Sequence, residues 1–123
     1  MNEREMIKRT KTFALRIMKL VGALPRTIQG RAIAGQLMRS GTSVAANYRA
    51  ACRSRSKAEF IAKLGTVEEE ADETAFWLEL IIEGSLLSPA QIQPLLIEAG
   101  ELVAITAASK KTASSTLAKS QIS

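Results

Sequence analysis

Apolar residues recur every three or four positions along most of the chain, which is the spacing of one face of an α-helix. We expect four helices, over residues 3–24, 27–53, 56–83 and 88–108. Proline and glycine residues interrupt the pattern between them. No stretch alternates apolar and polar residues with a period of two, so no sheet is expected. Short connections between long helices predict an all-α, antiparallel, up-and-down four-helix bundle.

Two of the predicted helices begin with a cap signal. Residues 56–59, Ser-Lys-Ala-Glu, form a capping box. In this motif the serine side chain accepts from a free backbone amide of the helix, and the glutamate side chain reaches back to the backbone amide of the serine. Serine followed by proline at 88–89 places the proline at a favoured first helical position. Pro94 follows closely, and it either kinks the first turns or marks the true start of this helix.

We expect one domain over residues 1–108. The segment 109–123, SKKTASSTLAKSQIS, is polar, small and low in complexity, and it predicts a frayed or disordered tail. A chain of 123 residues is long enough for a core without disulfides or metals. Only five residues are aromatic, so the core should be aliphatic.

The composition argues against a conventional enzyme. The chain has no histidine and a single cysteine, Cys52, which removes the commonest general base, the commonest metal ligand and any internal disulfide. We therefore expect no catalytic residues, no metal, no other cofactor and no small-molecule substrate. A charged N-terminus, a single cysteine and the lack of an uninterrupted apolar run of about 20 residues favour a cytoplasmic protein without a membrane span.

Charge is distributed unevenly along the chain. Residues 1–57 carry thirteen Lys or Arg and two Glu, residues 58–101 carry one Lys and ten acids, and the last segment carries three Lys. The simplest role of this division is attraction between the basic and acidic helices of one bundle. The alternative is a basic surface that remains available to phosphate groups.

Basic residues gather on the side of the second helix opposite its apolar face, which is centred on Leu37. Arginine suits phosphate because its planar guanidinium donates two hydrogen bonds at once. The same side chains could instead be solvated or could meet the acidic third helix. Aromatic residues for base stacking are missing from this stripe. The candidate nucleic-acid-binding residues are Arg39, Arg49, Arg53, Arg55 and Lys57.

The third predicted helix is apolar on two sides. If Phe60 and Ile82 face the core, then Phe76 and Leu80 fall on the outer side with Trp77 on the flank. Exposed aromatic and aliphatic side chains beside charged ones are typical of protein interfaces, so this face predicts self-association. The alternative is that the register differs and these residues belong to the core.

Three polar residues lie on one flank of the second helix. Because no base lies near them, Ser40, Ser43 and Asn47 favour a helix–helix or subunit contact rather than chemistry. The candidate oligomer-interface residues are Phe76, Trp77, Leu80, Ser40, Ser43 and Asn47.

The central part of the chain is similar to a known family. Residues 36–51, QLMRSGTSVAANYRAA, and residues 53–64, RSRSKAEFIAKL, closely resemble the four-helix-bundle family first noted as products of intervening sequences in 23S rRNA genes. The resemblance covers roughly residues 10–105. Many members carry an acid soon after the Asn-aromatic pair, where this chain has Arg49.

The resemblance implies a four-helix bundle that assembles as a five-fold ring. It also implies kinship with the accessory protein of diversity-generating retroelements, which binds reverse transcriptase and nucleic acid. The expected function is therefore a non-catalytic oligomeric scaffold that binds RNA, DNA or a nucleic-acid enzyme. A structural or regulatory protein-binding module with no nucleic-acid role is the alternative.

Overall fold

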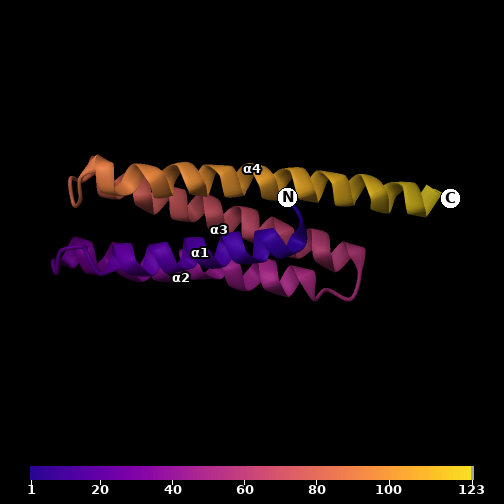
Figure 1. Cartoon of the computed structure of the whole chain (residues 1–123), viewed down its shortest axis with the longest axis horizontal. Coiled ribbons are helices and arrows are strands. Elements are labelled where there is room, and N and C mark those ends of the chain that lie inside the picture. The colour runs from indigo at the N-terminus through magenta and orange to yellow at the C-terminus, as the bar shows by residue number, and fades with distance from the viewer. Residues whose placement is uncertain (123) are drawn as a thin grey trace.

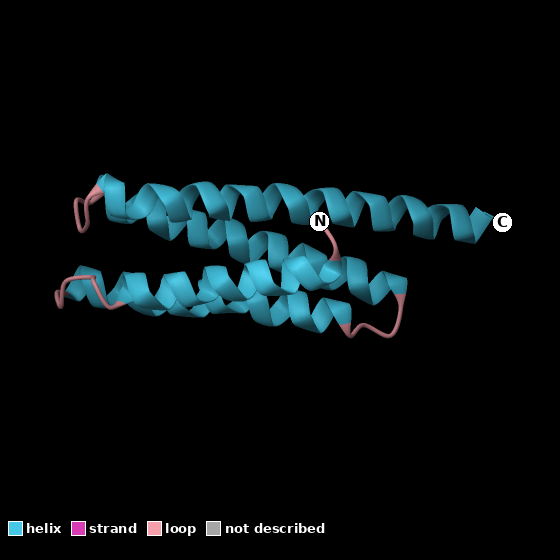
Figure 2. Ribbon diagram, viewed as in Figure 1, coloured by secondary structure: helices cyan, strands magenta, loops and turns pink. Residues whose placement is uncertain are grey.

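The computed structural model describes residues 1–122 as four antiparallel helices with short connections (Figures 1 and 2). They are α1 (Glu3–Val21), α2 (Ile28–Cys52), α3 (Lys57–Glu83) and α4 (Pro89–Ile122). Contacts join α1 to α2, α2 to α3, α3 to α4 and α4 to α1, and within the described chain none joins α1 to α3. The predicted four-helix bundle is confirmed, and α1 and α3 lie diagonally across it. The predicted ring-like assembly stays a prediction.

Side chains cap the starts of the helices. Ser56 Oγ accepts from the Glu59 amide at 3.1 Å, so the serine half of the predicted capping box is present. Thr27 Oγ1 accepts from the Gly30 amide at 3.0 Å in the same way. Pro94 lies inside α4, which begins at Pro89. Pro94 therefore does not mark the start of that helix.

The core is mainly aliphatic, as expected, although Phe13 and Tyr48 are also buried in it. Its fully buried centre includes Ile17, Leu37, Leu64, Leu78 and Leu102. The core face of α3 ends at Ile81, which is fully buried, while Phe60 and Ile82 are only half-buried. The structure therefore differs from the prediction only at the two ends of the core face, at Phe60 and Ile82.

Two glycines let α2 approach its neighbours closely. A Cβ atom added at Gly41 would lie 2.8 Å from Ile17 Cγ2, and one added at Gly30 would lie 1.9 Å from the carbonyl oxygen of Pro25. A side chain at either position would force α1 and the turn after it away from α2.

Helix α4 continues through residues 109–122, where the sequence predicted a disordered tail; Ser123 lies outside the described residues. The first turns of this segment pack on α3: Ala113 is buried, and Lys110 Nζ donates to Glu68 Oε1 at 2.7 Å. Alanine and lysine are good helix formers, so composition alone underestimated the helix. Figure 1 shows the end of α4 extending past the loop between α2 and α3.

Helix α4 is also the one helix in residues 1–122 that is long and apolar enough for a membrane span, over Pro89–Gln121, with a mean hydropathy of 1.2 in its most apolar stretch. Of that stretch, 28% is buried inside the bundle. A core helix passes the same test by length and composition. The predicted absence of a membrane span stays a prediction.

One cluster of ion pairs links α1 to α4. Arg9 donates through Nε to Glu98 Oε2 at 2.7 Å and through Nη2 to Glu98 Oε1 at 2.6 Å, and it also pairs with Glu101. The hydrogen bonds from Arg9 hold the pKa of Glu98 below its ordinary value. The hydrogen bond with Glu98 likewise raises the pKa of Arg9.

Alanine at the two glycines 30 and 35 should change stability in opposite directions. Gly30→Ala places its Cβ against the Pro25 carbonyl and should cost about 1–3 kcal/mol. Gly35 has no atom within 4 Å of the added Cβ, so Gly35→Ala should gain about 1 kcal/mol of helix propensity. Urea unfolding at one fixed protein concentration measures both. Destabilisation of the two variants by similar amounts would contradict the packing described.

Removing the Arg9 side chain's charge should destabilise the bundle in a pH-dependent way. The folded-state pKa of Glu98 lies below its ordinary value of 4.5, so the pair stabilises the fold above that value and is lost as pH falls. Arg9→Gln should therefore cost about 1 kcal/mol near neutral pH, and this cost should shrink as the pH falls below 4.5. Urea midpoints of both proteins across this range provide the measurement. A difference that does not shrink in acid would contradict the assignment.

Candidate nucleic-acid interface

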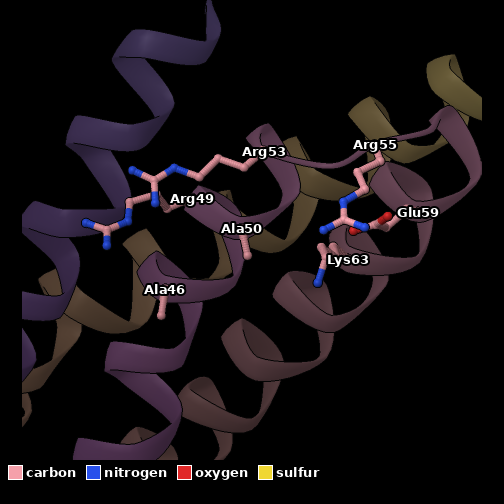
Figure 3. A pocket seen from close by; sticks show the side chains of 7 residues that line it. All are labelled: Ala46, Arg49, Ala50, Arg53, Arg55, Glu59 and Lys63. Carbon is pink, nitrogen blue, oxygen red and sulfur yellow. The ribbon is translucent and has the colours of Figure 1, made fainter.

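A basic groove lies on the outer face of α2, where its last turns run beside the first turns of α3. Its volume is about 460 Å³. Ala46 and Ala50 form a low, small-residue surface between two groups of longer side chains (Figure 3). The groove is lined by Ala46, Arg49, Ala50, Arg53, Arg55, Glu59 and Lys63.

The hairpin between α2 and α3 builds this groove. Residues 46, 49, 50 and 53 recur at three and four positions and so share one side of α2. Arg53 is the C-cap of α2, a position where a cation is favoured by the helix dipole. The chain then reverses, and α3 brings Glu59 and Lys63 back alongside these turns.

The cations of the groove are not neutralised within the protomer. In residues 1–122 no ion pair joins Arg49, Arg53 or Lys63 to a carboxylate. Figure 3 shows the guanidinium groups of Arg49 and Arg53 on one side, and Arg55 with Lys63 and Glu59 on the other. Four cations and one carboxylate leave a net charge of +3 in the lining. Such a cluster attracts anions.

Three of the five candidate nucleic-acid residues, Arg49, Arg53 and Arg55, meet in the groove. Arg39 does not. It pairs with Glu70, at 2.9 Å from Nη1 to Oε2, and with Glu73, so it links α2 to the acidic part of α3.

Lys57 also lies outside the groove. It contributes to two shallower cavities that Phe60 also lines. One of these cavities reaches Ala113 of α4, and the other reaches Glu3 near the start of α1. Lys57 therefore belongs to a different surface from Arg49 and Arg53.

Lys63 is the cationic groove residue that the sequence analysis missed. It lies on α3, in the half of the chain that is acidic overall. In an antiparallel hairpin, residues at equal distances from the loop face each other, and Lys63 and Ala46 lie about equally far from the loop at 53–56. That count would have placed Lys63 beside the arginines.

Ser40 makes a contact between α2 and α3 inside one protomer, which is the helix–helix contact of the two alternatives predicted for it. It is fully buried, and its Oγ shares a hydrogen bond of 2.9 Å with Thr74 Oγ1 of α3. Asn47 is satisfied within its own helix: Nδ2 donates to the Ser43 carbonyl oxygen at 2.9 Å and to Ser43 Oγ at 2.7 Å. Ser43 and Asn47 are both half-buried.

The predicted apolar face of α3 is partly exposed. Phe76 is 50% exposed, and its ring meets Trp77 edge-on with centroids 5.1 Å apart. Trp77 and Leu80 are half-buried. The sequence analysis missed two comparable side chains on α1, since Leu15 is 57% and Met18 47% exposed. These two apolar faces therefore belong to helices that lie diagonally across the bundle.

The single cysteine is poorly suited to nucleophilic chemistry. Burial raises the pKa of the Cys52 thiol, which favours the protonated form over the reactive thiolate. No cluster of three or more His, Cys, Asp or Glu able to hold a metal occurs in the described part of the chain. The groove itself presents cations and alanines, a set that binds anions.

Fold and groove together define an all-α bundle protein with an unneutralised cationic surface. The chain belongs to the 23S rRNA-intervening sequence protein family, which it matches over residues 2–108, so the resemblance noted in the sequence is confirmed. It is also similar to a solved protein of unknown function from the S23 ribosomal protein family of Bacteroides thetaiotaomicron. The two share 32% sequence identity and a TM-score of 0.81, over 86% of this chain and 98% of that one. No curated protein matches the chain.

Proposed function

We propose that this protein is a non-catalytic oligomeric scaffold whose basic groove binds the phosphate backbone of RNA. The observation that carries the proposal is the set of four groove cations, none of which forms an ion pair with a carboxylate in residues 1–122. Four such side chains around two alanines leave room for phosphate oxygens between them. The family description names an intervening sequence of 23S rRNA, which makes RNA the first nucleic acid to test.

Arginine and lysine have complementary roles in such a groove. The guanidinium groups of Arg49 and Arg53 can each donate two hydrogen bonds to one phosphate. Lys63 adds a compact charge on the opposite side. Contacts of this kind bind the backbone rather than the bases, and each neutralised phosphate releases counterions. The affinity should therefore depend steeply on salt.

Removing three groove cations should weaken RNA binding and flatten its salt dependence. In the variant Arg49→Gln/Arg53→Gln/Lys63→Gln, the slope of log affinity against log salt should fall by roughly 2–3 units, close to one per lost phosphate contact. Fluorescence anisotropy with a labelled mixed-sequence RNA measures the slope. Circular dichroism verifies the helical fold.

The matched control for this experiment removes the same charge elsewhere. Lys8, Arg31 and Lys111 are exposed and do not line the groove. Lys8→Gln/Arg31→Gln/Lys111→Gln should keep most of the affinity and slope. Equal losses in both variants would mean that only net charge matters. Absent or salt-insensitive binding by the natural protein would contradict the proposal.

A protein-binding module without nucleic acid is the second candidate function, and the exposed Phe76 favours it because aromatic side chains often anchor protein contacts. A protein partner that co-purifies from nuclease-treated cells, together with no RNA binding, would support this alternative.

The scaffold is proposed to assemble as a ring, with the α1 face of one protomer against the α3 face of the next. A closed ring requires two different surfaces on each subunit, whereas a two-fold dimer uses one surface twice. Leu15 and Met18 on α1 and Phe76 on α3 supply two separated apolar surfaces. The family resemblance suggests five subunits.

Mixing two interface variants distinguishes this arrangement from a two-fold dimer. Phe76→Glu and Leu15→Glu should each be monomeric by light scattering, because each buries a charge in one side of the contact. Their mixture should form one-to-one dimers, since each variant keeps the surface that the other has lost. Ile28→Glu is the control, since Ile28 is 88% exposed and lies away from both faces at the start of α2. A mixture that stays monomeric, or a natural protein that is monomeric, would overturn the ring.

A further inference from the structure

A second cavity adjoins the basic groove on the other side of α2. It lies between α1 and α2, has a volume of about 290 Å³ and is lined by Ile7, Lys11, Ala45, Ala46 and Arg49. Ala46 and Arg49 also line the basic groove, so the two cavities meet at these residues. We call this second cavity the apolar pocket.

The two cavities differ in chemistry. The basic groove carries four cations, whereas the body of the apolar pocket is formed by Ile7, Ala45 and Ala46, with Lys11 and Arg49 as its charged side chains. Because Ala46 contributes only a methyl group, the ridge of α2 between the cavities is low. A ligand can therefore occupy both cavities at once, with an anionic part on one side of α2 and an apolar part on the other.

We propose that the two cavities together hold one nucleotide unit of single-stranded RNA, with its phosphate in the basic groove and its base in the apolar pocket. This inference rests on the proposed function and specifies its ligand. A base has a flat, weakly polar ring that suits the apolar lining, while its phosphate suits the cations. Arg49 belongs to both cavities, so its guanidinium can stack on the base or donate to the phosphate.

The size of the apolar pocket limits the occupant. Cavities for drug-sized ligands hold roughly 300–1,000 Å³, and this pocket, at about 290 Å³, lies just below that range. It therefore suits a single ring system rather than a stack of bases. A base in a duplex is paired and stacked, so only an unpaired base can enter without unstacking. The natural ligand should be single-stranded at the nucleotide bound here.

Filling the apolar pocket should impair single-strand binding selectively. Ala45→Leu places a larger side chain in the pocket and should weaken the binding of a single-stranded oligouridine by about tenfold, the typical worth of one base contact. Binding of a blunt RNA duplex should not change. Ile7→Ala removes part of the apolar lining and is a second variant with the same expectation, because Ile7 lines the apolar pocket but not the basic groove.

The matched control is Ala32→Leu, at an exposed alanine on the same helix that lines neither cavity. It should leave both RNAs unaffected. If the two pocket variants change neither RNA, or weaken both equally, the base pocket is wrong. The proposed function stands in that case, provided that the groove variant still loses affinity. If the natural protein binds no RNA at all, both proposals fail.

A free nucleotide would offer the same chemistry as one unit of a strand. Competition between uridine monophosphate and the labelled oligouridine distinguishes a free nucleotide from a strand as the ligand. We expect no displacement of the oligouridine by an equal concentration of the monophosphate, because neighbouring phosphates add contacts that the free nucleotide lacks. Full displacement at that concentration would assign the cavities to a free nucleotide and overturn the strand assignment.

Discussion

The packing of α2 against α3 is the interaction on which the rest of the structure depends. In the middle of the hairpin, Arg39 pairs with Glu70 and Glu73, and Ser40 shares a hydrogen bond with Thr74. These contacts fix which part of α3 faces which part of α2. The acidic run at residues 68–73 therefore lies opposite the middle of α2, and the last turns of α2 face the start of α3. There the lining of the groove contains a single acid, Glu59.

The basic groove thus results from the way in which the basic residues of α2 are aligned with the acidic residues of α3. The basic and acidic halves of the chain would neutralise each other if opposite charges met at every position along the hairpin. In residues 1–122, Arg39 pairs with two carboxylates, whereas Arg49 and Arg53, about three and four turns further along the same helix, form no ion pair. The first interpretation drawn from the sequence, pairing with the acidic helix, applies at Arg39, and the second, a surface available to phosphate, stays a prediction for Arg49 and Arg53. Whether a basic residue of α2 pairs with a carboxylate therefore depends on its position along the hairpin.

Much of the fold followed from the sequence because the signals were local. Helical periodicity, the cap at Ser56 and the prolines predicted the four helices and most of their ends. The failures involved contacts between helices. The sequence left open whether Ser40 contacts another helix or another subunit, and the structure shows its contact with Thr74 of α3. Low complexity suggested disorder after residue 108, but Lys110 meets Glu68, and Ala113 is buried.

A groove that binds RNA weakly on its own would bind it more tightly if it were repeated in an assembly. One groove with four cations would make too few phosphate contacts for tight binding at physiological salt. In a ring the same groove would recur at a fixed spacing, so a strand held by one subunit would meet the next at high effective concentration. Affinity would then depend on the Phe76 contact as much as on Arg49, although the two lie on different surfaces. Assembly and nucleic-acid binding are therefore linked in this scheme, and a change that prevents the first should weaken the second without touching the groove.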